Sequence, residues 1–392
     1  MGVPKEVYQM EIAVRQHLPM LRPAQQSGLV WWVYGTILAH SACQTAVITA
    51  LRWYGSFGTL RQRLREWLYE GPDKAAPCHS QVEVSRCFEG LLRWLLTGWQ
   101  GQELALALDV TLQGERLAAL VVSVLYRGSA IPVAWHLLPA NEKGAWMPAI
   151  LKLFRQVRGA VPATMRVLVL ADRGLWSPTL WRELRRFQWH PLLRVQNHMT
   201  FAASGRDRCP VSALVQPGQA WVGRGRLGSP KRARLSVTLV VVWTADQKAP
   251  WAVVTDLKTN EVGVSGYALR MWVELGFRVL KSVGWQWQRS RRTDPARVAR
   301  HWLVLALATF WVMVYGTRVE EAERYGVAPA RMRTPPAPLI NPYPRRVSLF
   351  QLGLQCLQRL LLQGRWWQRW WLVPEPWPDP PPGLVIFVLE ET

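Results

Sequence analysis

Three apolar runs follow one another closely between residues 104 and 138, and they constrain the fold more than any other feature of the chain. They read LALALDVTL, LAALVVSVLY and AIPVAWHLL, and only the short polar turns QGER and RGS separate them. Apolar runs of strand length joined by short turns predict a three-stranded antiparallel meander. Two further runs, MRVLVLAD and WHPLLRVQ, predict two more strands.

Helices are predicted before each of these two later strands, at about 145–157 and 177–187. Ser177-Pro178 is typical of a helix start, with serine as the N-cap and proline in the first helical position. The resulting order, three strands followed by helix, strand, helix and strand, indicates an α/β (α+β) protein with an RNase H-like core.

Three carboxylates stand out against this pattern. Asp109 in ALDVT and Asp172 in LADRG each end an apolar run, where strands would deliver them to one edge of a sheet. Glu274 lies on a helix predicted from about residue 264 to 283. Two strand-end aspartates and one helical glutamate are a common way to hold two divalent metals for phosphodiester chemistry. The pattern predicts a nucleic-acid-cutting enzyme that needs no side-chain nucleophile.

The charge of the chain points to the same class of partner. Lys and Arg number 48 against 26 acidic residues, which gives a net charge of +22. A balance this basic favours a polyanion, and nucleic acid is the simplest candidate. Arginine, which binds phosphate with a bidentate fork, dominates the basic residues. Among the 24 tryptophans we expect mostly core residues, with one or two that stack on bases.

The cysteines and the apolar segments bear on location. The five cysteines form no C-x-x-C pair, which argues against a zinc ribbon or a disulfide framework and fits a reducing cytosol. No signal peptide is evident, so we expect a cytoplasmic protein. The longest apolar run, 302–316, is shorter than the roughly 20 residues of a bilayer span. Arg300 and Arg318 flank it, so we expect a buried helix and no membrane.

The first hundred residues read as helical. A long amphipathic stretch, VYGTILAHSACQTAVITALRWYG, precedes a Gly-Ser-Phe-Gly break and the Arg-rich stretch TLRQRLREWLYEG, for which Thr59 is the expected N-cap. Two interpretations stay open. The pair is a helix-turn-helix that binds DNA, or it is an ordinary helical hairpin with a basic, solvated face.

A β-rich insertion is predicted between residues 200 and 260. ARLSVTLVVVWT and PWAVVTDL are expected to be neighbouring strands joined by the turn ADQKA. The segment GRGRLGSPKRAR (223–234) is expected to be a basic loop that is a solvated turn or a phosphate contact. Beyond residue 325 the chain is Pro-rich, apart from an amphipathic helix, SLFQLGLQCLQRLLLQ, that packs on the core or on a second subunit.

Four polar residues fall on one face of the helix around Glu274. At 100° per residue, Tyr267, Arg270, Glu274 and Lys281 lie at about 0°, −60°, −20° and −40°. The opposite side carries apolar residues, namely Leu269, Trp272, Val273 and Leu280. One face is therefore core, and the other presents a carboxylate between a phenol and two cations. A plain surface ion pair between Arg270 and Glu274 explains only part of this pattern.

The spacing Tyr-x2-Arg-x3-Glu-x6-Lys resembles the signature of the insertion-sequence-four family of bacterial DDE transposases. ALDVT and LADRG look like the two Asp motifs of that family, and the resemblance covers about residues 100 to 315. It implies that Asp109, Asp172 and Glu274 hold two Mg²⁺ ions, with Mn²⁺ as a substitute. The implied reaction is hydrolysis at the ends of an insertion sequence, followed by strand transfer into target DNA.

The same resemblance implies roles for further residues. Tyr267, Arg270 and Lys281 would hold DNA phosphate near the cut, with help from Arg194. Trp251 would stack a flipped base during hairpin formation, although a tryptophan that merely caps the sheet is an equal alternative. For Arg173, a phosphate contact and a structural ion pair both remain open. The implied partners are double-stranded DNA, both terminal inverted repeats and target, and a second copy of the chain in a synaptic homodimer.

The organisation expected from these observations has five parts. They are a helical N-terminal domain that binds DNA ends (1–100), the first part of the catalytic core (101–198), a β-rich insertion (199–262), the second part of the core with the Glu helix (263–318), and a Pro-rich region for dimerisation or DNA contact (319–392). Two rival functions are kept, a transposase-derived DNA-binding protein that does not cut and a structure-specific nuclease on the same fold.

Overall fold

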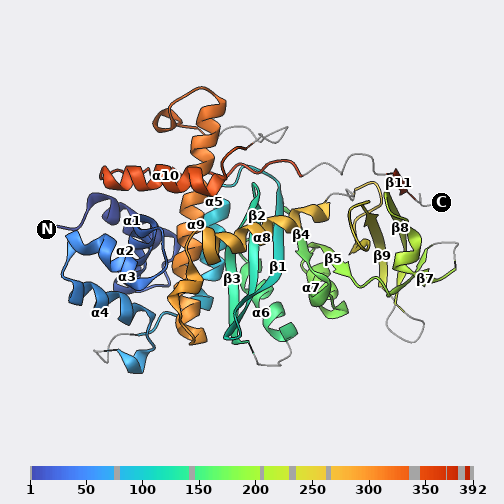
Figure 1. Cartoon of the computed structure of the whole chain (residues 1–392), viewed down its shortest axis with the longest axis horizontal. Helices are drawn as coiled ribbons and strands as arrows, with labels where there is room; N and C mark the ends of the chain where they lie inside the picture. Colours follow the sequence, from blue (N-terminus) through green and yellow to red (C-terminus); the bar gives the residue numbers. More distant parts are fainter. Residues whose placement is uncertain are drawn as a thin grey trace. The chain divides into compact units, whose positions relative to one another are not determined.

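The computed structural model describes residues 2–74, 80–140, 146–203, 207–228, 235–261, 266–334, 345–367, 369–377 and 385–388. The chain forms two compact units, and it passes between them more than once (Figure 1). The first unit contains residues 1–101, 110–163 and 274–375, and the second contains residues 102–109, 164–273 and 376–392.

The N-terminal part of the first unit is helical, as predicted. Its α-helices are α1 (Lys5–His17), α2 (Pro23–Ala39), α3 (Gln44–Leu51), α4 (Phe57–Leu68) and α5 (Phe88–Thr97). Two details of the prediction are wrong. The expected long helix is divided at His40, which has a left-handed φ of 47°. Helix α4 starts earlier than Thr59, because Ser56 is its N-cap and accepts the backbone N–H of Thr59 at 3.2 Å.

Helix α9 (Pro295–Arg324) is the core of the first unit. It contains the predicted apolar segment but is longer at both ends. The helix is long and apolar enough to cross a bilayer, yet 94% of its most apolar 18-residue window is buried inside the protein. The flanking Arg300 is itself buried and donates to the backbone oxygens of Leu68 and Val82. The prediction of a buried helix is therefore confirmed.

Helix α10 (Leu349–Leu362) packs against α9 at two glycines. A Cβ on Gly353 would lie 1.9 Å from the backbone oxygen of Val312, and a Cβ on Gly316 would lie 2.2 Å from that of Leu349. The backbones thus approach more closely than any side chain permits. The amphipathic helix thus packs on the core of its own unit, which is one of the two partners expected for it.

The first unit also holds a β-hairpin. Strands β2 (Leu117–Tyr126) and β3 (Ser129–Pro139) pair antiparallel, with an irregularity in register at Val122/Ser123, and helix α6 (Trp146–Arg158) follows. The strand order in this unit is β3-β2-β1, where β1 (Glu103–Gln113) contributes its last four residues. The predicted meander is therefore confirmed.

The second unit is built on three parallel strands. The first six residues of β1 pair with β4 (Arg166–Ala171), which pairs with β5 (His190–Val195). Helix α7 (Pro178–Arg186) connects β4 to β5 and starts as predicted, since Ser177 Oγ accepts the N–H groups of Thr179 and Leu180. The protein is a mixed α/β structure with an RNase H-like core.

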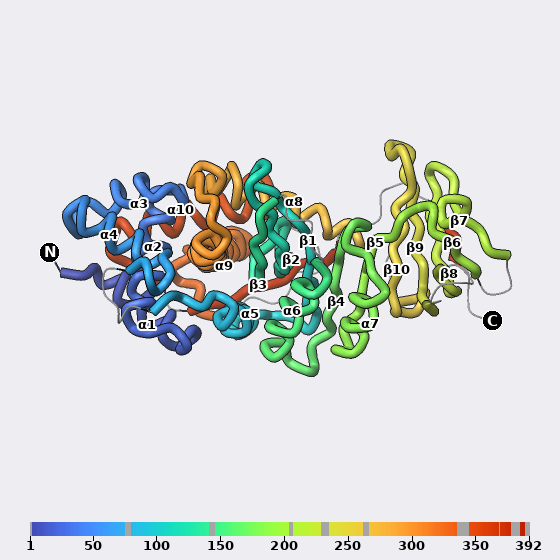
Figure 2. Tube along the Cα trace, turned by 90° about the horizontal axis from the view of Figure 1, so that it is seen from below, coloured from blue at the N-terminus to red at the C-terminus, as the bar shows by residue number. Residues whose placement is uncertain are grey.

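The predicted β-rich insertion extends the sheet of the second unit. From β5 the order continues through β10 (Trp251–Thr255), β9 (Leu235–Trp243), β8 (Gln219–Leu227), β6 (Thr200–Ala203) and β7 (Cys209–Pro210), and β11 (Val385–Val388) pairs with β8. Figure 2 shows β8, β9 and β10 side by side beyond β5. The expected pairing of the two long insertion strands, β9 and β10, is confirmed.

The predicted basic loop at 223–234 is in part a strand. Arg224 and Arg226 lie in β8 and pair with Thr238 and Ser236 of β9. The other three cations of that segment, Lys231, Arg232 and Arg234, lie outside the described residues, as does most of the Pro-rich sequence.

The close crossing of α9 and α10 yields a stability prediction. We expect Gly353→Ala to lower the free energy of unfolding by about 3 kcal/mol or more, because the new methyl group must force two helix backbones apart. Gly58→Ala in α4 is the matched control, since its Cβ meets nothing within 4 Å. The control should be neutral or stabilise the protein by up to about 1 kcal/mol. Urea unfolding followed by circular dichroism measures both, and equal values would contradict the packing described.

Candidate active site

The two aspartates lie side by side on neighbouring parallel strands of the second unit. Strands β1 and β4 pair in register up to Leu108 and Ala171, so Asp109 and Asp172 are the next residues on each strand. Asp172 directly follows β4, as predicted. Asp109 does not end its strand, contrary to prediction, because β1 continues to Gln113. Asp109 therefore lies within an intact strand, and only 8% of the residue is exposed.

One guanidinium lies against both carboxylates. Arg270 donates from Nη2 to Asp109 Oδ2 at 3.0 Å, and the same nitrogen lies 4.0 Å from Asp172 Oδ2. The side chains of Asp109 and Arg270 are mostly buried, while that of Asp172 is 30% exposed. With little water around them, two neighbouring carboxylates repel each other, and a cation beside both offsets that repulsion. The site is therefore shaped to hold positive charge between two acidic groups.

Arg194 approaches the outer side of Asp172. Strand β5 pairs with β4 up to Leu193 and Ala171, so Arg194 lies level with Asp172. Its Nη1 donates to Asp172 Oδ1 at 3.3 Å. The guanidinium carbon also lies 5.3 Å from the centroid of the Trp251 ring, in a cation–π contact. Arg194 thus links the carboxylate to the first residue of β10.

Tyr267 packs at the same place. Its hydroxyl lies 3.5 Å from Asp172 Oδ1 and from the backbone oxygen of Ala171, and its ring meets Trp251 edge-on at 5.8 Å between centroids. Burial raises the pKa of the Tyr267 phenol above its usual value, and the charge of Asp172 raises it further. The hydroxyl therefore stays protonated at physiological pH and is able to donate.

Four of the residues singled out in the sequence thus surround the two aspartates within one unit: Arg194, Trp251, Tyr267 and Arg270. Arg173 directly follows Asp172 in the chain. It is exposed, and its side chain forms no ion pair with any described residue. The phosphate contact expected for Arg173 stays a prediction.

The helix that carries Glu274 is not uniform. Residues Gly266–Arg270 form a 3-10 turn, Met271–Arg278 form helix α8, and Val279–Val283 form a π-helical turn. The stripe calculated at 100° per residue is therefore wrong in detail. Tyr267 and Arg270 lie one full 3-10 turn apart, so their side chains project from the same face.

Glu274 and Lys281 belong to the first unit. Glu274 is exposed, while Lys281 is half-buried, and burial lowers the pKa of its ammonium group. The two residues lie on either side of the change from α- to π-helical geometry.

The two carboxylates are chemically suited to a divalent metal ion. Their oxygens are the hard ligands that Mg²⁺ prefers, and they already converge on one positive group. Within the described ranges, no group of three or more His, Cys, Asp and Glu side chains is positioned to hold a metal ion. Asp109 and Asp172 alone would supply only part of a metal site, and a further ligand would be required to complete it.

An acidic pair on an RNase H-like sheet, surrounded by arginines, defines a candidate phosphodiester-cleaving enzyme. The sequence model of the transposase DDE domain family matches residues 138–311, a region that includes Asp172 and Glu274 and starts after Asp109. This part of the chain, which is less than half of its length, is therefore similar to the transposase DDE domain. No curated protein has a sequence that matches this chain.

Among solved structures, the chain is similar to a piggyBac transposase determined by cryo-electron microscopy in a synaptic complex with hairpin DNA. The identity is 11% and the TM-score is 0.35, over 87% of this chain and 86% of that one. A resemblance of this degree is too loose to equate individual residues.

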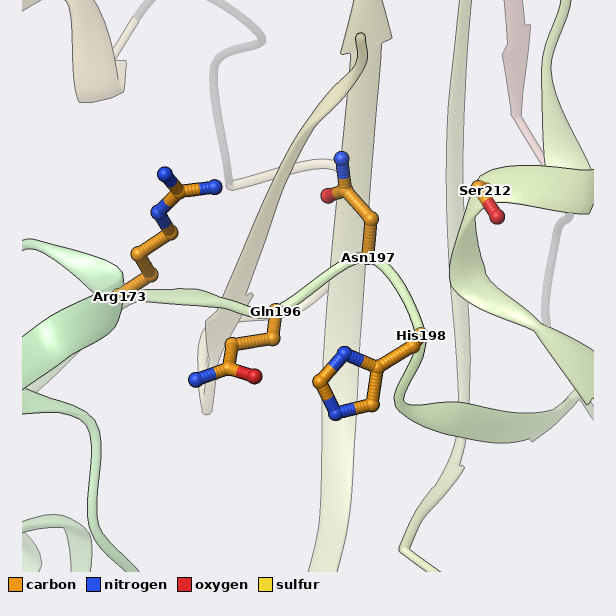
Figure 3. Close-up of a pocket in the computed structure, with 5 residues that line it drawn as sticks. All are labelled: Arg173, Gln196, Asn197, His198 and Ser212. Atoms are coloured by element: carbon orange, nitrogen blue, oxygen red, sulfur yellow. The ribbon is translucent and has the colours of Figure 1, made fainter.

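Sequence reasoning missed the turn that follows β5. Gln196, Asn197 and His198 line a pocket with Arg173 and Ser212 (Figure 3). A signal was present, because residues just after parallel strands gather at one edge of a sheet, where α/β proteins bind ligands.

The contacts of Tyr267 separate the role of its ring from that of its hydroxyl. We expect Tyr267→Phe to change the free energy of unfolding by less than about 1 kcal/mol, because the hydroxyl contacts are long and the ring contact with Trp251 persists. Tyr267→Ala should cost about 3 kcal/mol or more, because it removes a buried ring. Denaturant unfolding measures both. A large loss for Tyr267→Phe would contradict this division.

Proposed function

We propose that the protein is a DNA transposase of the insertion-sequence-four family. It cuts double-stranded DNA at the terminal inverted repeats of an insertion sequence and joins the 3′-OH ends to target DNA. The observation that carries the proposal is the pair of carboxylates, Asp109 and Asp172, at adjacent positions on parallel strands with Arg270 against both. The match to the transposase DDE domain supports it.

The proposed catalytic residues are Asp109, Asp172 and Glu274, which would together hold two Mg²⁺ ions, with Mn²⁺ as a substitute. Glu274 enters by its position in the Tyr-x2-Arg-x3-Glu-x6-Lys signature and supplies the further carboxylate that the aspartates require. When bound, the metals activate water or a DNA 3′-OH as nucleophile and neutralise the scissile phosphate.

The chain's own cations would hold the DNA. Arg270, one 3-10 turn from Tyr267, would bind a phosphate beside the carboxylates, and the neutral Tyr267 hydroxyl would donate to it. Arg194 would contribute a second guanidinium and Lys281 an ammonium group. Burial penalises the charged form of Lys281 and so lowers its pKa, and an anionic partner would stabilise that charge.

Trp251 is proposed to stack on a base that is flipped out of the duplex while a DNA hairpin intermediate forms. Its ring is partly exposed, and Arg194 and Tyr267 hold it against the site. A ring fixed by two neighbours keeps one orientation, which favours stacking on an incoming base.

The N-terminal helices are proposed to bind the DNA ends. Helix α4 buries Leu60, Leu64 and Trp67 and leaves Arg61 and Arg65 exposed. This basic face suits a phosphate backbone, whether the α3–α4 pair acts as a helix-turn-helix or as a simpler hairpin.

We also propose a homodimer in the synaptic complex, with the region after residue 319 contributing to dimerisation or DNA contact. The proposed place of action is the bacterial cytoplasm, at the nucleoid.

The carboxylate variants test the proposal directly. Asp109→Ala, Asp172→Ala and Glu274→Ala should each lower Mg²⁺-dependent nicking of DNA that carries the element ends by at least two orders of magnitude, while DNA binding persists. Asp246→Ala is the control, because this exposed aspartate lies in the turn between β9 and β10. Cleavage that survives in any one of the three variants would remove that residue from the catalytic set.

The rival functions are separated in the same assay. A nuclease on this fold would hydrolyse DNA and yield no strand-transfer product, whereas a DNA-binding derivative would bind ends and cut nothing. A transposase yields joined products between a labelled end and a target plasmid.

Metal binding offers a readout that does not depend on activity. We expect the free protein to bind Mn²⁺, and we expect Asp172→Asn to weaken that binding by roughly tenfold or more, since it removes an anionic ligand. Asp246→Asn should bind like the unmodified protein. Titration followed by electron paramagnetic resonance of free Mn²⁺ gives both affinities, and equal affinities would exclude Asp172 as a ligand.

A further inference from the structure

The turn after β5 has a fixed backbone. The N–H of Met199 donates to the oxygen of Gln196 at 3.0 Å, which closes a β-turn with Asn197 and His198 at its centre. Two further bonds tie the turn to the following 3-10 helix (Val211–Leu214), because Ser212 N–H donates to Asn197 O at 3.2 Å and Val211 N–H donates to Met199 O at 2.9 Å. The side chains at the centre of this turn therefore start from a defined position.

These side chains line an open pocket of about 600 Å³ in the second unit. Arg173 rises from one side and Ser212 from the other, with the turn between them (Figure 3). Residues on both sides of the turn lie next to candidate active-site residues in the sequence. Arg173 follows Asp172 in the chain, and Gln196 comes two residues after Arg194.

The residues that line the pocket are all polar or charged. It offers two amides, one imidazole, one hydroxyl and one guanidinium. Across the described ranges, no hydrogen bond or ion pair engages the side chains of Arg173, Gln196, Asn197 and His198, so their donors and acceptors are available to a ligand. Its volume lies within the range of sites that hold small ligands, and a nucleotide is of this size.

We propose that this pocket receives one nucleotide of the bound DNA next to the scissile phosphate and reads its base. Arg173 contacts the phosphate, and Asn197 and Gln196 contact the base edge. An amide side chain donates and accepts at once, which matches the N6/N7 edge of adenine, so the pocket selects adenine. This inference rests on the proposed function and adds a specificity-determining site to it.

Selection from a random duplex pool tests the inference. The protein binds 30-base-pair duplexes of random sequence in Ca²⁺, which replaces Mg²⁺ so that bound DNA is not cut, and the bound fraction is sequenced. The unmodified protein should enrich adenine at one position of its motif. Asn197→Ala or Gln196→Ala should lower that enrichment by roughly tenfold and leave the other positions unchanged.

Two further variants sharpen the test. Asn197→Asp keeps a residue that favours turns but only accepts hydrogen bonds, so the preference should move from adenine toward cytosine. Arg173→Ala should weaken binding to all sequences and reduce the slope of log affinity against log salt by about 1. The matched controls are Gln216→Ala and Arg182→Ala, which are exposed positions of the same unit outside the pocket.

The outcomes distinguish this inference from the function on which it rests. If the unmodified protein binds and cuts DNA but Asn197 and Gln196 variants keep its full base preference, the pocket reads no base and the inference fails alone. An affinity loss without any change in preference leads to the same conclusion. If the unmodified protein neither binds nor cuts DNA, the proposed function fails as well. Thermal unfolding of each variant verifies that it is folded.

Discussion

The parallel pairing of β1 with β4 is the constraint on which the candidate active site depends. It brings two carboxylates to adjacent positions, about 5 Å apart in the hydrogen-bonding direction of a sheet. Two such charges repel by about 3 kcal/mol at an effective dielectric constant of about 20, and by less where water reaches Asp172. Sheet register therefore creates a place where a cation offsets the repulsion between two carboxylates. Arg270 supplies a cation at this place. For the same reason, the two carboxylates are suited to act as metal ligands.

The surrounding contacts limit how this charge cluster can move. Arg194 is anchored at one end by the sheet pairing of β5 and at the other by Asp172 and the Trp251 ring. Tyr267 meets both Asp172 and Trp251. Each group has two partners, so displacement of one disturbs the others. If these residues bind DNA phosphate as proposed, such an arrangement would hold the binding group in place before DNA arrives and would lower the ordering cost of binding.

The sequence predicted the strands of the core well, because apolar runs of strand length joined by short turns leave few other structures open. The sequence-based prediction failed where the backbone departs from regular helix geometry and no residue type in the sequence signals the change. His40 divides the predicted helix, yet neither glycine nor proline announces it. The change from 3-10 to α to π geometry around Glu274 keeps apolar residues three or four apart, so the periodicity does not reveal it. The sequence GRGR suggested a loop, but it alternates as a strand does. Gly225 is required there because a Cβ would lie 2.2 Å from the backbone oxygen of Ala202.

The pocket beside Asp172 follows from the same sheet logic as the aspartates. Strands β4 and β5 are parallel, so the residues that follow them, Arg173 after Asp172 and Gln196 after Val195, leave the sheet at one edge. Charged residues on the strands gather into the acidic cluster, and polar residues one or two positions later gather into the pocket. Cleavage and base recognition would then share one rigid frame, and the distance between cut and recognised base would be set by strand register and not by a flexible loop. A change in either strand's register would disturb both functions together, whereas substitutions in the turn would alter base preference alone.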